Sequence, residues 1–103
     1  MRVIAQIRSS NHQELAMLVN VEFYGIPRSR AQVPSASATG VTLGEILQDL
    51  AARFPALGET CFHGSLLKPG FVANLRGDRF VSDPNTVLQD GDKLLLLSMD
   101  AGG

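Results

Sequence analysis

The sequence predicts a two-layer α+β domain, with one main helix packed on one face of a small mixed sheet. Three observations lead to this prediction. Residues 42–54 form a capped amphipathic helix, several short segments have the apolar pattern of strands, and the last of these, residues 93–99, is apolar on both faces. A strand that is apolar on both faces belongs in the middle of a sheet rather than at its edge.

The length and composition limit the chain to one ordinary domain. It has 103 residues, of which 45% are hydrophobic and 18% charged, as in soluble globular proteins. The net charge is -1 and no basic run occurs, so nucleic acid is not expected as a partner. No apolar run approaches the ~20 residues that cross a bilayer, so no membrane association is expected. Residues 1–17 lack the apolar core of a signal peptide, and with a single cysteine this favours a cytoplasmic location.

The first convincing strand covers residues 18–25. Val19, Val21 and Phe23 alternate with polar or amphipathic side chains, which is the pattern of a strand with one buried face. Residues 1–17 are interpreted as an N-terminal extension to a domain that spans residues 18–103. Whether this extension is ordered stays open, and in one alternative it folds back over the sheet.

The segment after the first strand leads to the helix. Residues 25–27 predict a turn, and residues 31–38 predict a weak edge strand that Pro34 keeps from extending its pairing. Thr42 and Glu45 have the spacing of a capping box, with Thr42 at the N-cap. Apolar residues then follow at helical spacing, and Pro55 is expected to end the helix.

The second half of the chain is expected to complete the sheet. Residues 56–70 predict a loop with about one helical turn, and residues 71–75 and 79–82 predict two strands joined by the turn Arg76-Gly77-Asp78. With the last strand central and beside the first, the expected fold is a β-grasp with four to five strands and one main helix on one face. This is the arrangement of ubiquitin-like proteins.

No catalytic residue, metal ligand or bound cofactor is predicted. Cys61 stands alone, and a lone cysteine is more often a small buried apolar residue than a reactive thiol. His63 lies two residues away and leaves a minor alternative in which Cys61 is reactive. Arg76-Gly77-Asp78 spells an adhesion tripeptide, but its flanking strands favour a hairpin turn.

The uncovered face of the sheet is the predicted docking surface for a partner protein. If Leu94 and Leu96 face the helix, alternation places Leu95 and Leu97 on the opposite face. Tyr24 from the first strand and Phe80 are expected to join them. An exposed apolar patch of this kind usually marks a protein interface.

The end of the sequence is the predicted reactive site. Residues 98–103 are interpreted as an exposed tail that leaves a central strand, with a free carboxylate on Gly103 and with Ala101 and Gly102 before it. Glycine suits this position because, without a Cβ atom, it lets a reactive centre approach the backbone closely.

Taken together, these motifs resemble the ubiquitin-like sulfur carrier family, which includes the small subunit of molybdopterin synthase and the thiamine-pathway carrier. The resemblance covers residues 18–103. The matching motifs are the segments 21–25, 71–74 and 86–92, the helix start at Thr42, and the final Gly102-Gly103. The long segment between the helix and the next strand favours the molybdopterin-type branch, whereas residues 1–17 depart from the family pattern.

The resemblance implies a carrier without a catalytic site of its own, in the manner of a molybdopterin synthase small subunit. An adenylyltransferase similar to ubiquitin-activating enzymes would adenylate Gly103 with ATP. A persulfide would donate the sulfur to form a thiocarboxylate, and a larger synthase subunit is a further expected partner. Two alternatives stay open: a protein modifier conjugated to lysines through Gly103, and a β-grasp interaction module that carries nothing.

Overall fold

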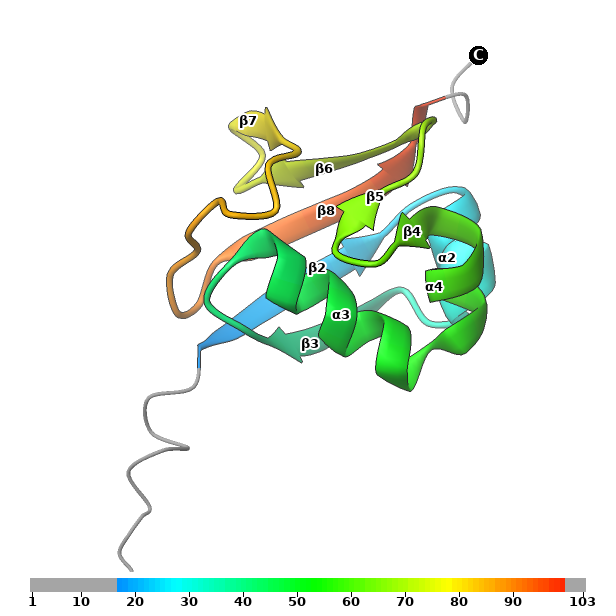
Figure 1. The fold of residues 1–103 in the computed structure, drawn as a ribbon, viewed down its shortest axis with the longest axis horizontal. Helices are drawn as coiled ribbons and strands as arrows, with labels where there is room; N and C mark the ends of the chain where they lie inside the picture. Colours follow the sequence, from blue (N-terminus) through cyan, green and yellow to red (C-terminus); the bar gives the residue numbers. More distant parts are fainter. Residues whose placement is uncertain (1–16, 100–103) are drawn as a thin grey trace, which may run out of the picture.

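A computed structural model describes residues 17–99, which form a five-stranded mixed sheet with helices on one face (Figure 1). The strands lie in the order β3-β2-β8-β6-β7, and β4 and β5 pair as a separate two-stranded sheet. This confirms the predicted α+β β-grasp architecture. The strands are β2 (Leu18–Phe23), β3 (Ser35–Thr39), β4 (Phe62–His63), β5 (Leu66–Leu67), β6 (Phe71–Leu75), β7 (Arg79–Val81) and β8 (Lys93–Ser98), and the helices are α2 (Ile26–Ala31), α3 (Leu43–Arg53) and α4 (Pro55–Cys61).

Strand β8 lies at the centre of the sheet, as its apolar sequence predicts. It pairs in parallel with β2, with Val21 opposite Leu94 and Phe23 opposite Leu96. On its other side it pairs antiparallel with β6. β2 is also an internal strand, because β3 forms the edge of the sheet beyond it. The alternation of the β2 side chains determines which of them point to the buried face of the sheet.

The core lies between the sheet and α3. The apolar stripe of α3 packs against the inward side chains of β2 and β8, and each such side chain adds roughly 1.5–3 kcal/mol when it leaves water. Phe54 extends this core, because its ring meets that of Phe23 edge to face with centroids 6.0 Å apart. The buried members from these elements are Val19, Val21, Phe23, Leu43, Ile46, Leu47, Leu50, Leu94 and Leu96.

Helix α3 begins as its capping residues predict. The Thr42 hydroxyl accepts a hydrogen bond from the Glu45 backbone N–H at 3.3 Å. The Glu45 carboxylate in turn accepts one from the Val41 N–H at 2.7 Å. These two bonds satisfy backbone donors that a helix start otherwise leaves without a partner.

Two connections differ from the predictions. The turn expected at residues 25–27 opens into helix α2, in which Pro27 and Ala31 are buried. Residues 56–70 contain the seven-residue helix α4 and the β4–β5 hairpin instead of one helical turn. Pro55 ends α3 but also starts α4, where its missing N–H is tolerated in the first turn.

The N-terminal extension is described only at Met17, so the expectations for residues 1–16 lie outside the described residues. The backbone N–H of Gly40 donates to the Met17 carbonyl at 3.1 Å, which extends the β2–β3 pairing to this residue. Within residues 17–99, no helix is long and apolar enough to span a membrane.

Candidate functional site

The face of the sheet opposite the helices has an apolar centre. Leu95 and Leu97 on β8 lie on this face and are half-buried. On β6, Val72 lies opposite Leu97 and Asn74 lies opposite Leu95. Because their neighbours Ala73 and Leu96 are buried in the core, alternation places these four side chains together on the open side. We call this side of the sheet the open face.

Phe80 and Tyr24 lie on either side of this apolar centre on the open face, Phe80 toward the β7 edge and Tyr24 toward β2. Phe80 on β7 lies opposite Asn74 and is 66% exposed. Tyr24 follows β2 and is 44% exposed. The structure therefore places all four side chains of the predicted docking surface on one face, together with Val72 and Asn74, which were not predicted.

Hydrogen bonds hold Tyr24 in place on the open face. Its hydroxyl donates to Glu22 Oε1 at 2.6 Å, and Lys93 Nζ lies 3.2 Å from Glu22 Oε2. The bond from Tyr24, followed by that from Lys93, lowers the pKa of Glu22. The same bond to the carboxylate raises the pKa of Tyr24. The apolar centre is thus bordered by a short polar row on β2 and β8.

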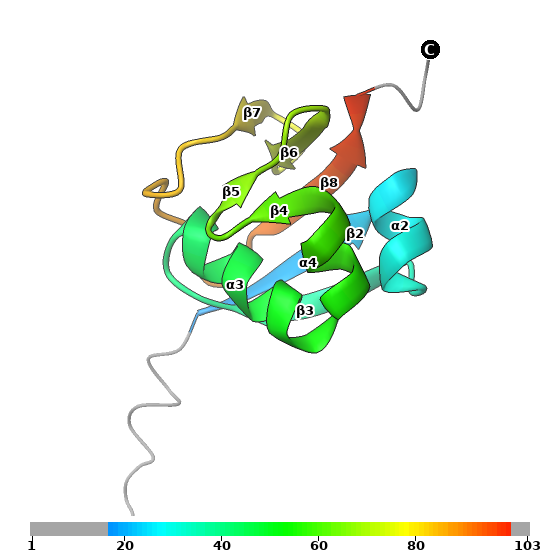
Figure 2. The same ribbon diagram turned by 45° about the vertical axis from the view of Figure 1, so that its right-hand side comes forward.

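The end of β8, where the tail begins, is held by hydrogen bonds on both sides of the strand. The Ser98 hydroxyl accepts a hydrogen bond from the Ile26 N–H of α2 at 3.2 Å, and the Met99 N–H donates to the Gly70 carbonyl at 2.7 Å. In both ribbon views the end of β8 lies at the same end of the domain as α2 (Figure 2). Ala101, Gly102 and Gly103 lie outside the described residues.

The start of the tail differs by one residue from the prediction. Ser98 was assigned to the exposed tail, but it is the last residue of β8 and is 2% exposed. The Ser98 hydroxyl accepts a hydrogen bond from the Ile26 N–H. Because this bond replaces the bond to water, a polar residue can end the strand inside the domain. The first exposed residue is Met99, at 65%.

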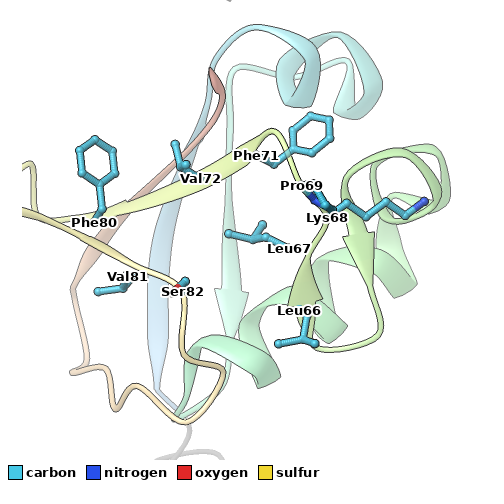
Figure 3. A pocket seen from close by; sticks show the side chains of 9 residues that line it. All are labelled: Leu66, Leu67, Lys68, Pro69, Phe71, Val72, Phe80, Val81 and Ser82. Carbon is cyan, nitrogen blue, oxygen red and sulfur yellow. The ribbon is translucent and has the colours of Figure 1, made fainter. Parts of the chain in front are cut away.

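A cavity of about 540 Å³ adjoins the open face beyond the end of β7 (Figure 3). Val72 and Phe80, which belong to the open face, form one side of it, and the β5 segment forms the other. Its only charged lining residue, Lys68, donates from Nζ to the Glu59 carbonyl at 2.6 Å. No pattern in the sequence indicates this cavity. Its lining is Leu66, Leu67, Lys68, Pro69, Phe71, Val72, Phe80, Val81 and Ser82.

The Arg76-Gly77-Asp78 segment is a hairpin turn, as predicted. Arg76 and Gly77 both have positive φ angles, 61° and 72°. Arg76 reaches across to the buried Asp92, with Nε 2.8 Å from Oδ1, and Asp92 also accepts a bond from the Gln89 N–H at 2.8 Å. Arg76 therefore stabilises the turn before β8 through contacts within the fold.

Cys61 is buried at the end of α4, as expected for a small apolar residue. Burial raises the pKa of its thiol to about 11, so the reactive thiolate is scarce at neutral pH. Neighbouring His63 is exposed on β4. Among residues 17–99, no three His, Cys, Asp or Glu side chains are grouped to hold a metal ion.

Comparison with protein families gives one match, in which the model of the ThiS family covers residues 17–103. Comparison with curated protein sequences gives no significant match.

Solved structures share the fold. The Amycolatopsis orientalis BexX/CysO complex contains a chain that is 26% identical, with a TM-score of 0.70, and the match covers 82% of this chain and 99% of that one. The small archaeal modifier protein 1 of Methanosarcina acetivorans is 21% identical, with a TM-score of 0.72 and coverage of 85% and 98%. A putative molybdopterin converting factor subunit 1 of Pyrococcus furiosus is 18% identical, with a TM-score of 0.65 and coverage of 80% and 97%.

Proposed function

Because the chain belongs to the ThiS family of small ubiquitin-like sulfur carriers, we propose that Gly103 carries sulfur as a terminal thiocarboxylate. The observation that carries this proposal is the exit of the tail. β8 is the central strand, and its end is held by α2 on one side and by Gly70 on the other. A side-chain-free Gly102-Gly103 end beyond such a fixed point can enter a narrow active site of another protein.

The proposed chemistry has three steps. The Gly103 carboxylate attacks the α-phosphate of ATP, pyrophosphate leaves, and an acyl-adenylate forms. The terminal sulfur of a persulfide then attacks the acyl carbon and displaces AMP, which leaves an acyl disulfide. A second thiol attacks the donor's sulfur in this disulfide, so that a new disulfide leaves and the thiocarboxylate remains.

The partner enzymes supply the catalytic groups for these steps. Among the described residues, the one thiol is that of Cys61, which is buried and has a pKa of about 11. The carrier contributes the reach of its tail and a surface to bind. We propose that the open face, centred on Leu95 and Leu97 with Tyr24 and Phe80, binds an ATP-dependent adenylyltransferase in the cytoplasm. Apolar surface with a polar border suits a protein interface of this kind.

The acceptor of the sulfur is proposed to be a molybdopterin-type precursor, held by a larger synthase subunit. The support is the long segment between α3 and β6, which contains α4 and the β4–β5 hairpin. The BexX/CysO chain, at 26% identity, is more similar than the converting-factor chain, at 18%. A carrier of the CysO kind is therefore the second candidate within the same chemistry.

A protein modifier is the alternative from a different class. The archaeal modifier shares the fold at 21% identity, and an activated glycine can also form an isopeptide bond with the amine of a lysine. This alternative predicts Gly103-dependent conjugates of higher mass in cells. A third reading, a β-grasp module that only binds, predicts that deletion of Gly102 and Gly103 leaves its function intact.

Intact mass spectrometry tests the proposal. The full chain is incubated with ATP, the adenylyltransferase encoded in the same genome and a persulfide donor. We expect one terminal oxygen to be replaced by sulfur, and we expect no replacement in a control chain that lacks Gly103. The absence of exchange in the intact chain, with an enzyme that consumes ATP in its presence, would contradict the proposal.

A further inference from the structure

One buried polar atom on the open face has no hydrogen-bond partner. Among buried side-chain oxygen and nitrogen atoms of residues 17–99, Asn74 Oδ1 has no hydrogen-bond partner. Native proteins leave few such atoms, because water no longer reaches them and nothing replaces it. Each instance therefore calls for a physical reason.

The position of Asn74 makes the missing partner more informative. On β6, Asn74 lies between Leu95 of β8 and Phe80 of β7, with Val72 two residues before it on the same face. Its amide thus sits in the middle of the apolar centre rather than in the polar row formed by Glu22 and Lys93. Asparagine is also depleted in strands, so a leucine at this position would suit the free protein better.

We propose that Asn74 is the polar recognition point of the open face, where its amide oxygen accepts a hydrogen bond from the adenylyltransferase. This inference rests on the proposed function, because it needs that enzyme as the partner. The complementary surface is apolar and carries one donor, a backbone N–H or a side-chain N–H or O–H, opposite the gap between Phe80 and Leu95. A partner surface without that donor leaves the Asn74 oxygen buried and without a hydrogen bond. Such a partner therefore binds more weakly.

The oxygen can become accessible without a change of fold. Phe80, which flanks the amide, is 66% exposed on a three-residue edge strand and has room to move. Binding would then exchange an unsatisfied acceptor for a satisfied one.

Two full-chain variants test the inference. Asn74→Leu removes the amide but keeps the size and extends the apolar patch, whereas Asn85→Leu makes the same change at an exposed position in the turn after β7, away from the open face. We expect Asn74→Leu to melt at the same temperature as the wild type or higher, yet to bind the adenylyltransferase roughly tenfold more weakly. Asn85→Leu should change neither quantity much.

The outcomes separate this inference from the proposed function. If Asn74→Leu binds the enzyme as tightly as the wild type or more tightly, the inference is wrong, even when the wild type is converted to the thiocarboxylate. If the wild type neither binds nor is converted, both proposals fail. If Asn74→Leu melts at a lower temperature, Asn74→Ala provides the second comparison, and wild-type affinity in that variant overturns the inference.

Discussion

The two faces of β8 carry the same residue type and have different surroundings. Leu94 and Leu96 are at most 1% exposed beneath α3, whereas Leu95 and Leu97 are half-buried on a face that no described element covers. The faces also differ in chemistry, since the open face holds the Asn74 amide oxygen, which has no hydrogen-bond partner, and the hydrogen-bonded row of Tyr24, Glu22 and Lys93. One side of the strand therefore stabilises the fold, and the other is the side that we propose binds the partner.

Leu96→Ala should have the largest effect on this comparison. The deletion of a fully buried leucine side chain removes transfer energy and leaves a cavity, so the free energy of unfolding should fall by about 2–5 kcal/mol. Urea unfolding followed by circular dichroism measures it, and Leu47→Ala in α3 should behave alike. If Leu96→Ala and Leu97→Ala lowered the free energy of unfolding equally, the distinction between the two faces would be wrong.

Leu97→Asp should act on binding rather than on the fold. A charge at the centre of an apolar interface is desolvated without a partner, so affinity for the adenylyltransferase should fall by about 2 kcal/mol, as for an interface hot spot. Calorimetry measures the affinity, and thermal unfolding measures the fold. A collapse of the thermal midpoint in this variant would place Leu97 in the core.

Asp92→Asn tests the turn before β8, which both faces share. Its hydrogen bonds from Arg76 lower the pKa of Asp92 in the folded state. Their contribution is therefore complete above the ordinary Asp pKa of ~3.9, and it is lost as the pH falls through the lowered pKa of the folded protein. Because Arg76 is partly exposed, the substitution should lower stability at neutral pH by only about 1 kcal/mol.

Urea unfolding of Asp92→Asn and the wild type at neutral and acidic pH checks this effect. The gap between the two proteins should narrow as the pH falls. Asp78→Asn, an exposed position in the preceding turn, is the matched control. A gap that grows in acid would show that the Arg76 bonds do not set the stability of the turn.

Cys61→Ala should have the smallest effect on function. Its thiol is buried on the covered side of the sheet and has a pKa of about 11, so the rate of thiocarboxylate formation should be that of the wild type. Alkylation of native wild-type protein at neutral pH should also be slow. A variant that folds but no longer accepts sulfur would return Cys61 to the mechanism.

Much of the fold follows from local sequence patterns. The alternation in β2, the capping residues of α3 and the double apolar face of β8 each report on burial directly, so the predicted sheet and main helix were correct. Helix α2 was missed because six residues give too short a pattern, and its formation depends on the burial of Pro27 and Ala31. Ser98 was placed in the tail because a hydroxyl reads as exposed until its partner, Ile26, is known.

The candidate site divides in the same way. Leu95, Leu97, Tyr24 and Phe80 could be assigned to one face because strand alternation and strand order are enough to place them. Asn74 could not, because the missing partner of its Oδ1 atom depends on three strands meeting around it. The Arg76–Asp92 pair joins residues 16 positions apart through a turn with positive φ, which no short motif indicates.

The central claim is that Gly103 carries sulfur, and tandem mass spectrometry of the chain recovered from its native cells tests it most directly. The C-terminal peptide should contain a fraction in which one oxygen of the Gly103 carboxylate is replaced by sulfur. Recovery of Gly103 only as an unmodified carboxylate, or only in isopeptide bonds to lysines of other proteins, would contradict the claim.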